Sequence, residues 1–193
     1  MKKVGVLALQ GDFEAHAKAL ERAGAQAVEV RSASALADLD GLIIPGGEST
    51  TMLKLLHAEN LLQPLADFGR QKPVFGTCAG AILLASEVSR PAQESLKLVD
   101  IAVERNAYGR QLDSRVTHIA PAPDFVSRTS EAGDLEAVFI RAPIIRRAGP
   151  EVKVLAEYQH DPVLVEQGRH LVATFHPELT QDPRVHQLFL SKL

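Results

Sequence analysis

The sequence predicts an α/β fold: a single-domain three-layer sandwich over residues 1–193, with a mostly parallel central sheet and a strand-rich second half. One observation is that the early strand candidates are apolar without alternation, as expected for strands covered on both faces. Another is that helical segments separate these strands, and β-α alternation implies right-handed crossovers and a parallel sheet. A third is that from about Leu98 strand candidates follow one another, most of them separated by turns with Pro or Gly.

The first half alternates strands with helices. The apolar run 3–9 predicts a strand, and Asp12 can cap a helix whose residues Phe13, Ala17 and Leu20 recur at helical spacing. Gly24 ends that helix. Further strands are expected over 27–30, 41–45 and 73–76, and further helices after a cap at Ser49 or Thr50 and over 61–69.

The second half contains mostly strands. We expect them over 98–104, 115–119, 137–140, 152–158, 163–166 and 171–175, followed by a closing helix over 184–193. The polar segment 120–133 contains Pro121 and Pro123, which indicates an exposed loop.

Composition limits the classes of function. The net charge is −3 with no block of Lys or Arg, which argues against a nucleic-acid partner. No run approaches the ~18 apolar residues of a membrane span. The single cysteine excludes an intramolecular disulfide, so a cytoplasmic location is expected. No Cys/His cluster has zinc-site spacing, so we expect no metal and no cofactor.

That cysteine, Cys78, lies in Gly76-Thr77-Cys78-Ala79-Gly80, between an apolar run and an Ala/Leu-rich stretch. This is the Gly-x-nucleophile-x-Gly spacing of a strand-to-helix elbow, where the turn is tight and small neighbours are needed. The elbow directs the first free amides of the next helix at the thiol, where they lower its pKa and bind an oxyanion. A lone cysteine is most often a small buried hydrophobe, but the glycines and the strand-turn-helix setting favour a nucleophile.

A second motif, His176-Pro177-Glu178, follows the apolar run 171–175. Residues two apart in an extended segment point to the same side, so Glu178 can accept the proton of one imidazole nitrogen while the other faces the thiol. His-Pro-Glu also occurs in ordinary loops. Together with Cys78, it predicts the triad of a cysteine hydrolase or transferase.

Other candidate residues have two interpretations each. The segment 45–51 is a turn with an N-cap, or a loop in which the amide of Gly47 joins that of Ala79 in an oxyanion hole. A phosphate-binding loop is not indicated, because the Gly-x-x-x-x-Gly-Lys pattern is missing and no Lys follows. Arg105 and Arg141 end apolar strands, and each is a solvated charge or a carboxylate-binding group. The other histidines have no partner in the sequence and are interpreted as surface or core residues; they are His16, His57, His118, His160, His170 and His186.

With these motifs, the sequence resembles the triad-type (class I) glutamine amidotransferases over nearly its whole length. More narrowly, it resembles the glutaminase subunits of pyridoxal phosphate synthase. The motifs are Val6-Leu-Ala-Leu-Gln-Gly11, Pro45-Gly-Gly-Glu-Ser-Thr-Thr-Met52, Phe75-Gly-Thr-Cys-Ala-Gly80, Val103-Glu-Arg-Asn-Ala-Tyr-Gly-Arg-Gln111, Phe139-Ile-Arg-Ala-Pro143 and Phe175-His-Pro-Glu-Leu179.

The resemblance implies hydrolysis of L-glutamine to L-glutamate and ammonia through a thioester, with Cys78 as nucleophile, His176 as base and acid, and Glu178 as the orienting group. The residues that it implies for glutamine binding are Gly47, Glu48, Ser49, Arg105, Ile140 and Arg141. It also implies a partner, a (β/α)8-barrel synthase subunit that receives the ammonia within a large hetero-oligomer and makes pyridoxal phosphate (vitamin B6). The glutaminase is expected to be poorly active alone.

Two rival functions remain open. Intracellular peptidases and deglycases with a similar sheet place an acid at the end of the first strand, where this chain has Leu9-Gln10-Gly11. A regulatory or scaffold subunit would keep the fold without the chemistry, but this sequence retains a nucleophile, a base and an orienting acid.

Overall fold

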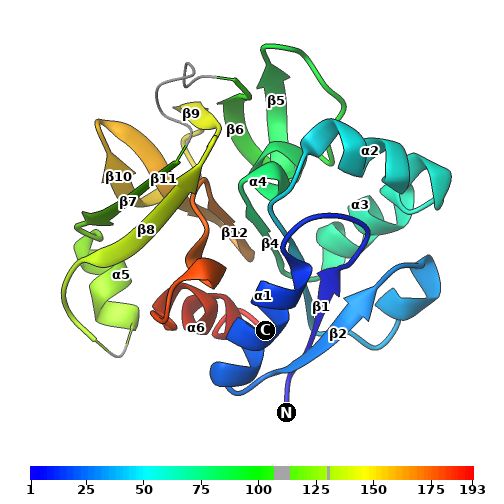
Figure 1. Cartoon of the computed structure of the whole chain (residues 1–193), viewed down its shortest axis with the longest axis horizontal. Helices are drawn as coiled ribbons and strands as arrows, with labels where there is room; N and C mark the ends of the chain where they lie inside the picture. The colour runs from blue at the N-terminus through cyan, green and yellow to red at the C-terminus, as the bar shows by residue number, and fades with distance from the viewer. Residues whose placement is uncertain (107–113, 130) are drawn as a thin grey trace.

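A seven-stranded sheet with the order β10-β11-β12-β4-β3-β1-β2 forms the centre of the computed structural model (Figure 1). The structure describes residues 1–106, 114–129 and 131–193. The strands are β1 (Lys3–Leu7), β2 (Gln26–Val30), β3 (Gly41–Ile44), β4 (Val74–Thr77), β10 (Lys153–Tyr158), β11 (Asp161–Gln167) and β12 (His170–Ala173). The pairs β1–β2, β1–β3, β3–β4 and β4–β12 are parallel, whereas β10–β11 and β11–β12 are antiparallel. The predicted mostly parallel sheet is therefore confirmed.

Helices cover both faces of this sheet and complete the three layers. Helices α2 (Ser49–Ala58), α3 (Leu62–Gln71) and α4 (Ala79–Leu84) pack in one apolar cluster, and α1 (Phe13–Arg22) and α6 (Arg184–Leu190) in the other. In β3, Leu42 and Ile44 belong to the first cluster and Ile43 to the second. Each face of the strand is thus buried, which explains why it is apolar throughout.

Two smaller sheets are formed mostly by the second half of the chain. Strands β5 (Ala85–Ser89), β6 (Val99–Glu104) and β9 (Ile144–Ala148) form a three-stranded sheet, and β7 (Ser114–Ile119) pairs with β8 (Leu135–Ile140). Strands β5 and β9 were not predicted, because neither is an uninterrupted apolar run; Arg146 and Arg147 of β9 are exposed. No helix in the described part of the chain is long and apolar enough to cross a membrane.

The prediction of an exposed loop over 120–133 is wrong. This segment contains helix α5 (Pro123–Arg128), whose Phe125 is fully buried in the second apolar cluster. Pro123 stands in the first turn of the helix, where the missing N–H costs nothing. The proline interpreted as a loop signal is therefore a helix start.

Candidate active site

Cys78 sits at a sharp turn between β4 and α4. Its backbone has φ 50° and ψ −104°, a conformation that residues other than glycine rarely adopt. A Cβ on Gly80 would overlap the carbonyl oxygen of Ile44, and one on Gly76 would overlap the carbonyl oxygen of Gly80. The structure thus confirms the predicted strand-to-helix elbow and explains its small residues.

His176 lies shortly after β12 (His170–Ala173) and forms a hydrogen bond with Glu178. Nδ1 of His176 is 2.6 Å from Oε1 of Glu178, and both side chains are buried. The expected contact is present, but the reason given for it is wrong. The segment is not extended: Pro177–Leu179 forms the 3-10 helix η3, and its tight turn brings the two side chains together. The backbone N–H of His176 also donates to the carbonyl of Val138, which ties the segment to β8.

The surroundings of His176 favour its charged form. Burial by itself would lower the pKa of this imidazole, but the Cys78 and Glu178 side chains outweigh burial and raise the pKa to about 10. Asp12 adds a further carboxylate, with Oδ2 3.7 Å from Nδ1 of His176. His176 therefore holds a proton at neutral pH.

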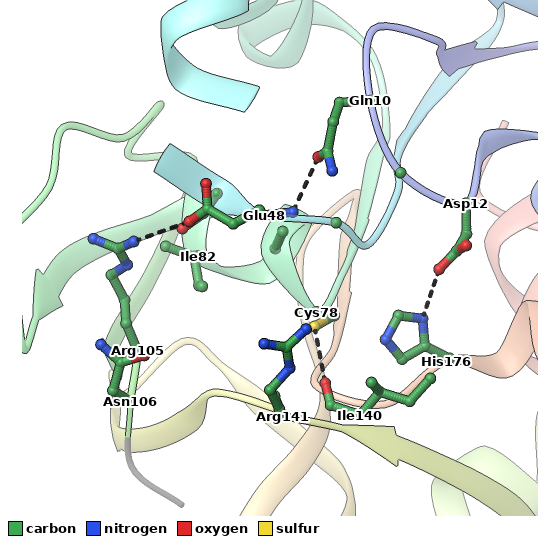
Figure 2. Close-up of a pocket in the computed structure, with 14 residues that line it drawn as sticks. Gln10, Asp12, Glu48, Cys78, Ile82, Arg105, Asn106, Ile140, Arg141 and His176 are labelled. Carbon is green, nitrogen blue, oxygen red and sulfur yellow. Dashed lines mark hydrogen bonds and ion pairs between the residues drawn. The ribbon is translucent and has the colours of Figure 1, made fainter. Parts of the chain in front are cut away.

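The predicted residues meet around one pocket of about 470 Å³ at the carboxyl ends of the parallel strands (Figure 2). Its lining residues are Gln10, Gly11, Asp12, Gly47, Glu48, Ser49, Cys78, Ala79, Ile82, Arg105, Asn106, Ile140, Arg141 and His176. Glu178 is absent from this lining and lies behind His176. A volume of this size suits a small molecule such as an amino acid. Five lining residues were not predicted: Gln10, Gly11, Asp12, Ile82 and Asn106. The position of the first three after the first strand was an available signal.

The loop that carries Gly47 is tied to the loop after β1. The carbonyl of Gly46 accepts a hydrogen bond from the N–H of Asp12 at 3.2 Å. The N–H of Glu48 donates to Oε1 of Gln10 at 3.0 Å (Figure 2). These two bonds hold the Gly46–Gly47 peptide on both sides, next to the pocket.

Glu48, and not Ser49 or Thr50 as predicted, caps helix α2. Its carboxylate accepts hydrogen bonds from the N–H groups of Thr50 at 3.2 Å and Thr51 at 2.6 Å. Burial by itself would raise the pKa of Glu48, but the hydrogen bonds from Thr51 and Thr50 lower it. The prediction was wrong because N-caps are usually residues with short side chains, such as Ser and Thr, whereas here the longer Glu48 side chain folds over the first turn of the helix.

The two predicted arginines differ in exposure. The Arg105 side chain is only 11% exposed. Its Nη2 donates to Oγ1 of Thr50 at 2.6 Å and lies 3.7 Å from Oε1 of Glu48. The solvated-charge interpretation of Arg105 is therefore wrong. Arg141 is exposed and has φ 44°, and it follows Ile140, whose carbonyl accepts a 3.9 Å hydrogen bond from the Cys78 thiol. Both arginines border the pocket (Figure 2).

Among the described residues, Asp12, His176 and Glu178 form the one group whose ligand atoms lie close enough together to hold a metal ion. His176 and Glu178 are already hydrogen-bonded to each other. In addition, the raised pKa of His176 keeps a proton on the imidazole that a metal would have to displace. The hydrogen-bonded His176 and Glu178 are therefore better suited to proton transfer than to binding a metal ion.

The comparisons with known proteins agree with this architecture. A solved structure described as a crystal structure of glutamine amidotransferase is 46% identical with a TM-score of 0.87, covering 98% of this chain and 97% of its own. PurLQS from Thermotoga maritima shares the fold at 16% identity, with a TM-score of 0.70 and 98% of each chain covered. The fold and the pocket thus define a glutamine amidotransferase.

Relatives of higher identity narrow this class. Pyridoxal 5'-phosphate synthase subunit PdxT from Solibacter usitatus (strain Ellin6076) is 70% identical over 193 residues, which is 100% of both chains. The protein of the same name from Koribacter versatilis (strain Ellin345) is 53% identical and covers 97% of this chain and 94% of its own. The chain belongs to the SNO glutamine amidotransferase family, whose model matches residues 6–193.

Proposed function

We propose that the chain hydrolyses L-glutamine to L-glutamate and ammonia with Cys78, His176 and Glu178 as its catalytic triad. The observation that carries the proposal is the elbow cysteine bordering the same pocket as a buried His–Glu pair. The ionised Glu48 and the cations Arg105 and Arg141 give this pocket charges of both signs. That combination suits the ammonium and carboxylate groups of a free amino acid.

In this mechanism the thiolate of Cys78 attacks the side-chain amide carbon, and the amide oxygen becomes an oxyanion. The N–H groups of Gly47 and Ala79 donate to that oxyanion. His176 then gives its proton to the leaving nitrogen, so ammonia departs and a thioester remains. The neutral imidazole takes a proton from water, the resulting hydroxide attacks the thioester, and glutamate leaves with the thiolate restored.

Glu178 supports both halves of this cycle. Its Oε1 accepts the Nδ1–H of His176, which leaves the other imidazole nitrogen for the reacting groups. The carboxylate also stabilises the imidazolium that holds the proton between the two steps. Glu178 does not need to exchange a proton itself.

We further propose that the ammonia passes to a synthase subunit that makes pyridoxal phosphate. The support is the family membership and the name shared by the relatives at 70% and 53% identity. A (β/α)8-barrel partner within a large hetero-oligomer is the form that the sequence resemblance implies.

The test is glutamate release from glutamine, measured with the wild-type chain and a Cys78→Ala variant, each with and without a candidate synthase barrel. Cys78 is only 6% exposed but borders the pocket, so loss of its thiol enlarges the pocket without opening a cavity in the core. We expect no glutamate from the variant, and pyridoxal phosphate from its complex when ammonium salt is supplied. Glutamine-dependent synthesis by the complex with the variant would refute the assignment of Cys78 as nucleophile. Failure of ammonium to support synthesis would refute the role of this chain as the ammonia donor.

A further inference from the structure

Behind the triad lies a buried pair of histidines that the mechanism above does not use. His16 in α1 and His186 in α6 are both fully buried, and Nδ1 of His16 is 3.0 Å from Nε2 of His186. The other nitrogen of His16, Nε2, is 3.0 Å from Oγ1 of Thr77, the residue before the elbow cysteine. The pair therefore connects α6 to the elbow through the interior of the protein.

The same His16 nitrogen reaches the triad carboxylate. Nε2 of His16 lies 3.4 Å from Oε2 of Glu178, and both side chains have no exposed surface. Among the described residues, Oε2 has no partner at good hydrogen-bond geometry, whereas Oε1 is bonded to His176. A buried carboxylate oxygen that accepts no hydrogen bond destabilises the folded protein, so a nearby N–H that can donate to it is stabilising.

The hydroxyl of Thr77 can donate to Nε2 of His16 or accept from it, so the neighbouring carboxylate of Glu178 selects the arrangement of protons. A carboxylate only accepts hydrogen bonds, so the His16 nitrogen that faces Glu178 must carry its proton. Burial, followed by the charges of His186 and His176, holds the pKa of His16 well below its ordinary value, so this imidazole is neutral and its Nδ1 is bare. Nδ1 then accepts the Nε2–H of His186, which leaves His186 Nδ1 bare as well.

The environment of His186 agrees with this assignment. Burial and the positive charge of Arg22 lower the pKa of His186 to about 4, so it is neutral too. Its Nδ1 is buried without a hydrogen-bond partner among the described residues. A bare acceptor nitrogen is tolerated there better than an unpaired N–H would be. The N–H of His186 thus points at His16, and the N–H of His16 lies between Oγ1 of Thr77 at 3.0 Å and Oε2 of Glu178 at 3.4 Å.

We infer that His16 is a positioning residue for the triad: its Nε2–H, shared with Oγ1 of Thr77, donates to Oε2 of Glu178 and holds that carboxylate in the orientation that His176 requires. The hydrogen bond to Oε1 alone leaves the carboxylate free to rotate, whereas a donor on each oxygen fixes its plane. We expect the 3.4 Å separation to shorten in the substrate complex, where catalytic hydrogen bonds tighten. This inference rests on the proposed role of Glu178.

The proton arrangement is tested without any activity assay. Long-range ¹H–¹⁵N NMR correlations of the wild-type chain at pH 7 distinguish the two neutral tautomers of each histidine. We expect His16 and His186 to be neutral with the proton on Nε2. A His16 tautomer protonated on Nδ1 cannot donate to Glu178 and would overturn the inference, whatever the substrate of the enzyme.

Kinetics test the consequence. His16→Phe keeps a ring beside Phe75 and His186 but removes the donor, and we expect kcat for glutamine hydrolysis to fall by roughly 10- to 100-fold with KM within about twofold. His16→Gln places an amide N–H in the same region and should recover most of that loss. A fully active His16→Phe variant, or a His16→Gln variant that recovers nothing, would refute the positioning role.

Two controls separate positioning from general damage. His170 is another buried histidine, in β12, and accepts the Val74 N–H far along the strand from the elbow; His170→Phe should lower stability and leave kcat unchanged. Thr77→Val removes the other acceptor near His16 but leaves Glu178, so it should keep most of the activity. If Thr77→Val lost as much kcat as His16→Phe, His16 would act through the elbow and not through Glu178.

Discussion

Acidification from pH 7 to pH 5 should destabilise this protein strongly, because it buries neutral histidines. Burial lowers the pKa of His186 to about 4, and burial together with the charge of Arg169 lowers that of His170 to about 4. In the unfolded chain each imidazole titrates near its ordinary value of about 6.5. Between these values the unfolded state binds more protons than the folded state, so stability falls as the pH falls.

The magnitude follows from the size of the shifts. Each group loses about 1.4 kcal/mol per pH unit below its unfolded pKa, which is about 2 kcal/mol at pH 5. His186 and His170 together then cost about 4 kcal/mol, and His16 acts in the same direction. His176 offsets about 1 kcal/mol of this loss, because its raised pKa keeps the folded state protonated at pH 7 while the unfolded state takes up that proton only as the pH falls through about 6.5. A loss of this size is a large part of the 5–15 kcal/mol of a typical domain.

The assay is urea unfolding followed by circular dichroism at pH 7, 6 and 5. The free energy of unfolding should decrease at each step, and the midpoint should fall with an unchanged slope. His170→Leu removes one titrating group, so its loss of stability between pH 7 and 5 should be smaller than that of the wild type by about 2 kcal/mol. Stability that stays constant or rises between pH 7 and 5 would refute the reasoning.

Three further predictions concern the site. His176→Asn should almost abolish glutamine hydrolysis and Glu178→Gln should reduce it less, since the first loses the base and acid and the second only its orienting partner; steady-state kinetics showing the reverse order would contradict these roles. Gly80→Ala places a Cβ against the carbonyl oxygen at the end of β3, so both activity and urea resistance should fall, and a wild-type-like variant would count against a sterically closed elbow. The synthase partner should raise turnover by on the order of a hundredfold, the scale of one oxyanion donor, because we expect its contacts to rotate the Gly46–Gly47 peptide until the Gly47 N–H points into the site. Gly47→Val, whose Cβ overlaps Oε1 of Gln10, should reduce that activated turnover more than glutamine binding, and equal wild-type rates with and without partner would show that the hole is preformed.

Local patterns were enough to predict the framework of the site. Apolar runs identified the strands of the central sheet, and the glycines around Cys78 identified the elbow. Parallel strands end at one edge of a sheet, so these patterns also predicted that Gly46-Gly47 and Cys78 lie together there, as they do. Such features depend on residues close together in the chain, and a sequence displays them directly.

Features that depend on distant partners were missed or assigned for the wrong reason. Segment 120–133 is polar, yet Phe125 within it is buried in a cluster contributed by other elements. Even the local contact of Glu178 with His176 was assigned for the wrong reason, because a 3-10 turn forms it and not an extended segment.

The buried histidines show this limit most clearly. His16 and His186 are 170 positions apart and neither has a signal in its own neighbourhood, so the sequence determined only that each was a surface or core residue. The packing of α1 and α6 on one face of the sheet decided that they touch each other and lie behind Glu178. Burial then makes their protonation a property of the tertiary structure, because removing an imidazole from water is what keeps it neutral.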